Sequence, residues 1–214
     1  MSEFDITDRW DEDIKTQEMQ EKALLRKIEY HNIAYKRVTA LDDLCPVPGE
    51  NEQWRIITEH PMNAYVFIVS LLNRENIKEM YLSTYRMNKP TVDNIIEKIE
   101  NGRIEKANFI INQLQGMSKT SAGPVAQLKE YCDNSKNAKM VYTNIHAKVF
   151  IAQTKGGAKY VFEGSGNLTA NGCIEQYIYE RNSQVYDFHK NWMNEVLISC
   201  AQRKTSTCNN VVIL

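Results

Sequence analysis

Apolar residues recur along the chain with two alternating spacings. Short blocks rich in β-branched and aromatic residues predict strands, and longer stretches with apolar positions three or four apart predict helices. The strands predicted before residue 150 are 54–57, 78–85, 106–112 and 139–143, and the helices between them are 62–73, 90–101 and 125–132. This alternation predicts an α/β fold, a mixed β-sheet flanked by helices on both faces.

The pattern changes after residue 143. Two apolar blocks flank residues 155–157, where the pair of glycines supplies the positive φ of a tight hairpin turn. A strand over 176–179 and an amphipathic helix over 184–199 are predicted to follow. The residues that helical spacing places on the buried face of this helix are Val185, Phe188, Trp192, Val196 and Leu197.

The N-terminal quarter differs from the rest in charge and pattern. Residues 1–21 hold eight acids and two bases, which favours a solvated arm, or one that packs on a partner subunit or over a basic groove. Helical spacing predicts a helix over 14–38, and the two prolines within 46–49 end that segment. We therefore expect an acidic, helical extension over 1–50 and a core domain over 51–214.

Composition limits the class of protein. With 43% hydrophobic and 25% charged residues among 214, the chain resembles a globular domain. Its five scattered cysteines form no C-x-x-C pair, which favours reduced thiols in a cytoplasmic location and argues against structural zinc. No apolar run approaches the roughly 18 residues of a membrane span, and the acidic start is unlike a signal peptide.

Charge is unevenly distributed along the chain. The net charge is −1, but 12 acids and 7 bases lie in residues 1–50, which leaves 15 acids and 19 bases, or +4, beyond them. This balance permits nucleic-acid binding by the core domain.

Polar side chains gather around the predicted hairpin. His146 and Lys148 lie two residues apart on its first strand, so both point to the same face. The second strand ends in residues 164–167, Gly-Ser-Gly-Asn, and Glu175 follows. An imidazole, an ammonium, a hydroxyl and an amide together suit a phosphodiester.

This pattern resembles the H-x-K…G-S-x-N signature of the phospholipase D superfamily. The segment up to Glu175 resembles the one that supplies the supporting carboxylate of the family. The local match covers 144–192, and the upstream pattern is compatible with one superfamily domain over about 51–200. The residues that match the signature are His146, Lys148, Gly164, Ser165 and Asn167.

The resemblance implies the chemistry of the site. His146 would attack phosphorus and form a phosphohistidine, while a second histidine protonates the leaving oxygen. Lys148 and Asn167 would stabilise the phosphoryl oxygens, and Ser165, next to Gly164, would hydrogen-bond them. Glu175 would orient His146 from its far nitrogen. The scheme requires no metal and no other cofactor.

The chain has one H-x-K motif, whereas the scheme needs two histidines. His31, His60 and His189 lack the pattern, and we expect His189 on the C-terminal helix. Single-motif members of the superfamily form one composite site per homodimer, so the resemblance implies a two-fold homodimer.

Two departures from the family pattern bear on activity. Gln153 stands five residues after Lys148, where the longer motif has an aspartate, and the fifteen residues between Lys148 and Gly164 exceed the interval of the compact motif. A weakened or inactive enzyme therefore stays open. Further candidates near the site are Glu163, as a second choice of carboxylate, and the strand-end pair Tyr85 and Arg86.

The function that these residues predict is a metal-independent phosphodiesterase, specifically a nuclease that acts on DNA or RNA as a homodimer. The small chain, the single motif and the lack of an apolar membrane-facing segment favour nucleic acid over lipid. Two alternatives stay open. One is a phospholipid or small-molecule phosphodiesterase or transferase with the same histidine chemistry, and the other is a nucleic-acid-binding or assembly protein that keeps the fold with weak or no catalysis.

Overall fold

A computed structural model describes residues 30–58, 62–169 and 172–208. Eight strands in this part of the chain form one sheet in the order β1-β2-β8-β7-β6-β3-β4-β5. The β1–β2, β3–β4 and β4–β5 pairs are parallel and the other four are antiparallel. In chain order the strands are β1 (Asn32–Val38), β2 (Glu52–Thr58), β3 (Ile77–Thr84), β4 (Ala107–Asn112), β5 (Ala138–Thr143), β6 (Val149–Thr154), β7 (Lys159–Gly164) and β8 (Glu175–Arg181).

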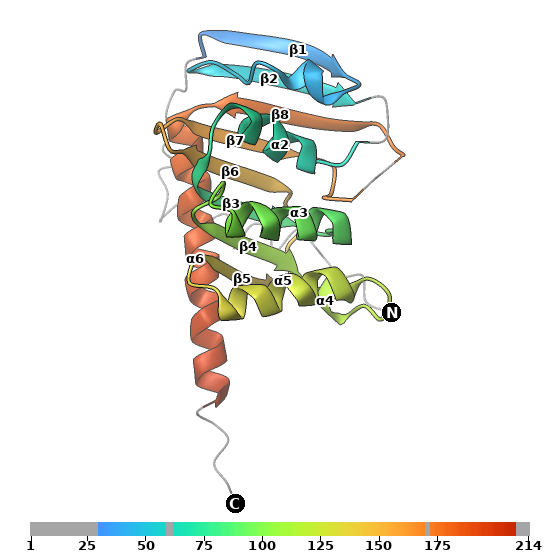
Figure 1. Cartoon of the computed structure of the whole chain (residues 1–214), viewed down its shortest axis with the longest axis vertical. Coiled ribbons are helices and arrows are strands. Elements are labelled where there is room, and N and C mark those ends of the chain that lie inside the picture. Colours follow the sequence, from blue (N-terminus) through green and yellow to red (C-terminus); the bar gives the residue numbers. More distant parts are fainter. Residues whose placement is uncertain (1–29, 59–61, 170–171, 209–214) are drawn as a thin grey trace, which may run out of the picture.

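Helices lie on both faces of the sheet, as Figure 1 shows. α2, α3 and α5 pack on one face, and the long α6 crosses the other. The predicted α/β architecture, a mixed sheet with helices on both faces, is therefore confirmed. The helical elements are the 3-10 turn η1 (Leu41–Leu44), α2 (Tyr65–Arg74), α3 (Lys89–Glu100), α4 (Gln113–Met117), α5 (Ala122–Asn134) and α6 (Ser183–Cys208).

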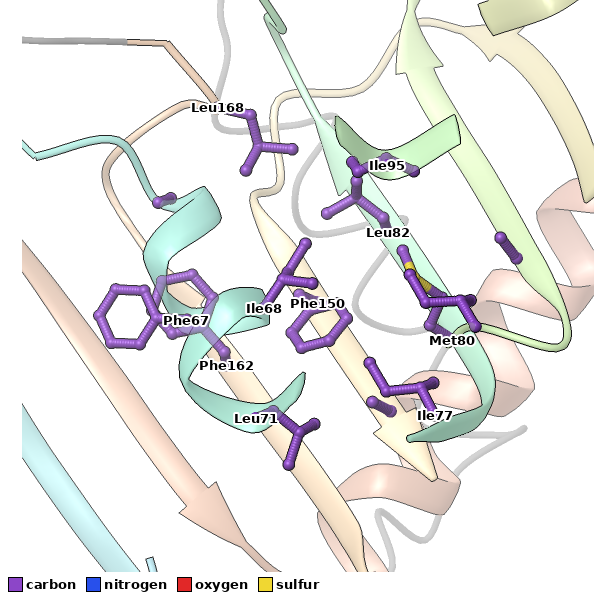
Figure 2. Close-up of a cluster of buried hydrophobic side chains, with 14 of the residues drawn as sticks. Phe67, Ile68, Leu71, Ile77, Met80, Leu82, Ile95, Phe150, Phe162 and Leu168 are labelled. Atoms are coloured by element: carbon purple, nitrogen blue, oxygen red, sulfur yellow. The ribbon is translucent and has the colours of Figure 1, made fainter. Parts of the chain in front are cut away.

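The core on the first face is centred on α2 (Figure 2). Phe67, Ile68 and Leu71 point from this helix toward Phe150 of β6 and Phe162 of β7. All five side chains are buried, and the rings of Phe67 and Phe162 stack with centroids 3.8 Å apart. Burying side chains of this size contributes about 2 kcal/mol each, so this layer fixes α2 against the β6–β7 hairpin.

The core on the second face lies under α6. Ile110 of β4 and Val161 of β7 pack with Tyr186 and Met193 of the helix. At β1 and β2 the same face keeps large apolar side chains exposed among the described residues. These are Ile33, Tyr35 and Ile57, which are 45%, 80% and 40% exposed.

The helix prediction for the N-terminal extension is wrong where the structure describes it. Residues 32–38 form β1, which pairs in parallel with β2. Helical and strand spacing both fit this short segment, and pairing with a strand twenty residues away decides between them. Residues 14–29 of the predicted helix lie outside the described residues. The division into an extension (1–50) and a core domain (51–214) stays a prediction.

The buried face of α6 is also rotated from the prediction. Phe188, predicted to be buried, is 65% exposed, whereas Tyr186, His189 and Met193 are buried. These three residues lie three and four apart and form the stripe that meets the sheet. The other predicted positions, which pack against this core as partly buried side chains, are Val185, Trp192, Val196 and Leu197.

Candidate functional site

Strand direction brings the motif segments to one edge of the sheet. The parallel strands β3 and β4 end at this edge, and β6 begins there because it is antiparallel to β3. By the same alternation β7 ends there and β8 begins there. Ligands of open α/β sheets usually bind outside the carboxyl ends of the parallel strands, so the fold favours this edge as the site.

His146 and Lys148 meet at this edge. The Lys148 Nζ lies 3.0 Å from His146 Nδ1 and donates to the His146 carbonyl at 3.0 Å. The two residues precede β6, which begins at Val149, so the prediction that both lie on the strand is wrong. Their side chains are nevertheless together, and the imidazole is exposed to solvent.

Side chains of β3 and β4 hold the segment that carries His146. The side-chain amide of Asn112 donates to the Ile145 carbonyl, and the backbone amide of Val149 donates to Ser83 Oγ at 3.3 Å. The Tyr85 ring lies 5.1 Å from the His146 ring, centroid to centroid. Sequence reasoning overlooked Asn112. Its signal was an amide directly after the apolar run at 109–111.

The loop after β7 packs tightly on Tyr177 of β8. A Cβ added to Gly164 would lie 2.1 Å from Tyr177 Cδ1, and one added to Gly166 would lie 1.9 Å from the Tyr177 hydroxyl. Glycine is therefore required at both positions for this close approach. The Gly164 amide also donates to the Lys148 carbonyl at 3.2 Å, which joins the two motif segments.

Ser165 and Glu175 are partners in this structure. The Ser165 hydroxyl donates to the Glu175 carboxylate, which is buried, and the Gln176 amide donates to Ser165 Oγ at 3.0 Å. The hydroxyl thus supports Glu175 here. Substrate binding by Ser165 and orientation of His146 by Glu175 stay predictions.

Electrostatics links Lys148 to Glu175. Partial burial lowers the pKa of Lys148, and the negative charge of Glu175 opposes this shift. Asn167 lies in the same loop as Ser165, and its side-chain oxygen is buried without a hydrogen-bond partner among the described residues. An amide in this position has hydrogen-bonding capacity left for a ligand.

His189 belongs to the core under α6. The Trp192 indole donates to His189 Nδ1 at 3.0 Å, and His189 Nε2 lies 3.5 Å from a Glu163 carboxylate oxygen. Burial lowers the pKa of His189 to about 4 and raises that of Glu163. His189 is therefore a neutral core histidine at pH 7, which agrees with its predicted place on the C-terminal helix.

The remaining candidates are dispersed. Gln153 pairs with Glu79 and Lys159 at the far end of β6, away from Lys148. Arg86 is exposed, and its carbonyl accepts from the Leu168 amide at 3.1 Å.

Two further kinds of feature are absent from the described residues. No group of three or more His, Cys, Asp or Glu side chains in this part of the chain has an arrangement that suits a metal ion. No helix within the same ranges is long and apolar enough to cross a membrane. The groups that the structure does bring together at the site are the imidazole, ammonium, hydroxyl, amide and carboxylate described above.

A groove runs from this edge across the sheet. It has a volume of about 730 Å³ and is lined by residues of β1, β2, β8 and β7 and by the Ala147–Val149 segment. Lys148 and Gly164 line both the groove and the candidate site. A ligand in the groove would therefore continue into the site.

Comparison with solved structures places the fold. Polyphosphate kinase from Porphyromonas gingivalis is similar over 69% of this chain and 26% of its own, with a TM-score of 0.50 and 16% sequence identity. The fold is phospholipase D-like. At this identity the likeness concerns the fold alone. The sequence matches no family model and no curated protein.

Two further solved structures are similar to this chain. NucT from Helicobacter pylori matches over 63% of this chain and 86% of its own, with a TM-score of 0.47 and 17% identity. Phosphatidylserine synthase from Haemophilus influenzae Rd KW20 matches over 67% and 38%, with a TM-score of 0.47 and 12% identity.

Proposed function

We propose that the protein is a metal-independent phosphodiesterase that cleaves nucleic acid through a phosphohistidine, at a site shared by two subunits. The contact between Lys148 Nζ and His146 Nδ1, 3.0 Å apart at the ligand-binding edge of the sheet, carries the proposal. An exposed imidazole beside an ammonium is placed to attack a phosphorus atom whose oxygens the ammonium neutralises.

The reaction would take two displacements at phosphorus. A His146 nitrogen forms a bond to phosphorus, the bond from phosphorus to the leaving oxygen breaks, and that oxygen takes a proton from the partner subunit's His146. Water then attacks the phosphohistidine and gives its proton to the partner's His146. The P–N bond breaks, the phosphomonoester leaves, and both imidazoles return to their starting state.

The loop after β7 completes the proposed site. Asn167 would donate from its side-chain NH2 group to a phosphoryl oxygen. Its side-chain oxygen, which is an acceptor, is buried without a partner among the described residues. Ser165 and Glu175 form a hydrogen-bonded pair beside Lys148. We assign this pair to holding the ammonium and the loop in place around the phosphate.

Exposed apolar residues support a dimer at this edge. α4 follows Asn112, the residue that holds the His146 segment, and its Leu114 and Met117 are 53% and 77% exposed. Ile174, next to Glu175, is exposed as well. A second copy seated on this rim by two-fold symmetry would bury these side chains and bring its own His146 to the site.

The test is cleavage of plasmid, single-stranded DNA, RNA, a phospholipid and a generic phosphodiester by the full chain with EDTA present. We expect cleavage of nucleic acid, and a rate reduced roughly 10³-fold or more by His146→Asn. The matched control His31→Asn changes an exposed histidine outside the site and should leave the rate unchanged. Activity that needs a metal, or that survives His146→Asn, would contradict the proposal.

Mixed dimers test the shared site. When wild-type and His146→Asn chains are combined in equal amounts and allowed to exchange subunits, only dimers of two wild-type chains keep both histidines. Activity per total chain should then fall to about a quarter of the wild-type value. A fall to about half would mean that each subunit works alone.

A further inference from the structure

The groove beside the site is lined by a continuous row of side chains across five strands. Tyr35 of β1 pairs with Arg55 of β2, Arg55 with Ile178 of β8, Ile178 with Glu163 of β7, and Glu163 with Val149 of β6. Directly paired residues share a face of the sheet. The row therefore lies on the face that α6 crosses and ends next to Lys148.

A second row runs beside the first. Arg37 pairs with Ile57, and Ile57 pairs with Gln176. The backbone amide of Gln176 donates to Ser165 Oγ at 3.0 Å. This row therefore ends at the loop that carries Asn167. Both rows lead from the β1 edge of the sheet to the two motif segments.

The lining combines positive charge with exposed flat or apolar groups. The charged side chains on this face are the cations Arg37, Arg55 and Lys148, against the single carboxylate of Glu163. The ammonium of Lys36 lies on the other face, 3.1 Å from the centroid of the Trp54 ring. Tyr35 is 80% exposed and Ile57 is 40% exposed. Cations that follow a backbone, together with an aromatic ring open to solvent, are what a single nucleic-acid strand requires, because its bases are free to stack.

We propose that this groove, from Tyr35 through Arg55 to Lys148, binds a segment of single-stranded nucleic acid and leads it to His146. The inference rests on the proposed function and names the substrate class. The four strand spacings from β1 to β6 span about 19 Å, which several stacked nucleotides at about 3.4 Å each would fill. Arg55 contacts phosphate, Tyr35 stacks on a base, and the exposed Ile57 side chain lies between them and the site.

The experiment measures binding in the full-length His146→Asn chain, so that the strand is not cut. Fluorescence anisotropy gives the Kd of fluorescein-labelled thymidine oligonucleotides of about 3 and about 12 nucleotides. We expect Arg55→Gln and Tyr35→Ala each to weaken binding of the longer strand about 5-fold or more, with little effect on the shorter one. Arg55→Gln should also lower the dependence of log Kd on log salt by about 0.7.

Matched controls separate the groove from general charge and from folding. Arg74→Gln removes an exposed arginine at the end of α2, on the other face of the sheet, and should leave both Kd values unchanged. Tyr35→Trp keeps a stacking ring and should keep the affinity for the longer strand. Melting temperatures of all variants should match the parent, because Tyr35 and Arg55 are exposed.

Three results would overturn the inference. The first is an unchanged Kd for the longer strand in Arg55→Gln and Tyr35→Ala. If sedimentation then shows an altered oligomeric state, the face belongs to a second copy of the chain. The second is tighter binding in Arg55→Gln, which would assign the groove to the acidic residues 1–21. The third is equal weakening of binding for both lengths of oligonucleotide.

A wild-type protein that binds the strand but does not cleave it would instead contradict the proposed function and leave the groove inference intact.

Discussion

Within the described part of the chain, both faces of the sheet are covered at the β4 end and only one is covered at the β2 end. Phe109 and Ile110 are neighbours on β4, point to opposite faces, and are both fully buried. Ile56 and Ile57 are neighbours on β2, yet Ile56 is buried under the first helical layer and Ile57 is 40% exposed. Two adjacent apolar residues are thus both buried at the β4 end of the sheet, whereas at the β2 end only one of the two is buried.

The candidate site lies where these two regions meet. The His146 segment is held by Asn112 and Ser83 from the covered strands. The groove that opens beside Lys148 runs over the uncovered strands to β1. Under the proposed function, the covered half would position the reacting groups and the uncovered half would accept the nucleic-acid strand.

The largest expected effect tests this division by truncating one residue in each half. Phe109→Ala should lower the free energy of unfolding by about 3–5 kcal/mol, because it leaves a cavity in a fully buried layer. Ile57→Ala should lower it by less than about 1 kcal/mol, since water already reaches that side chain. Urea denaturation measures both. Equal losses would mean that the open face is covered in solution.

The second test acts on the loop at the boundary. Gly166→Ala should cost about 1–3 kcal/mol and reduce activity, because its Cβ would lie 1.9 Å from the Tyr177 hydroxyl. Adding Tyr177→Phe removes that hydroxyl and should restore part of both losses. The single change Tyr177→Phe should be nearly neutral, since the hydroxyl is buried without a partner in the described part of the chain.

A matched glycine provides the control for this test. At Gly123 in α5 an added Cβ meets nothing within 4 Å, so Gly123→Ala should stabilise the fold by up to about 1 kcal/mol. If Gly166→Ala were equally harmless, the loop would have to sit farther from β8 than the structure places it.

The covered half was the easier part to predict from sequence. β4 contains the apolar run Phe-Ile-Ile at 109–111, and such a run is typical of a strand buried on both faces. β2 carries the polar Arg55 between Trp54 and Ile56, which indicates one open face, but this pattern does not say what the open face binds. The motif residues were found because they lie close together in sequence, from His146 to Glu175.

The failures arise where distant segments decide the local structure. Residues 32–38 form a strand because they pair with β2, and the local spacing of these residues does not show that pairing. Phe188 is apolar but lies outside the row of α6 residues that packs on the sheet. Which row packs on the sheet depends on how the helix docks, and the helix sequence does not contain that information. Asn112 acts on Ile145 from thirty-three residues away. Arg55 and Tyr35 become neighbours only through strand pairing, so the groove is visible only in the fold.

The smallest expected effect concerns pH and the histidine under α6. In the fold, burial lowers the pKa of His189 to about 4 from the ordinary value of 6.5. Between these values the unfolded chain takes up a proton that the folded chain does not, so stability falls as pH drops from 6.5 toward 4, by up to about 3 kcal/mol. Glu163, whose pKa burial raises, takes up its proton earlier in the fold and offsets part of this loss. The net fall should therefore be smaller than the contribution of His189 alone.

Substituting His189 measures the contribution of this buried histidine to the pH dependence of stability. His189→Gln should flatten the stability profile between pH 6.5 and 4, measured by urea denaturation at several pH values. His31→Gln changes an exposed histidine and should leave the slope as it is. An equally steep slope in His189→Gln would mean that His189 does not contribute to it, so that its imidazole is less buried under α6 than the structure places it. The covering of the second face by α6, and with it the contrast between the covered and uncovered halves of the sheet, would then be in question.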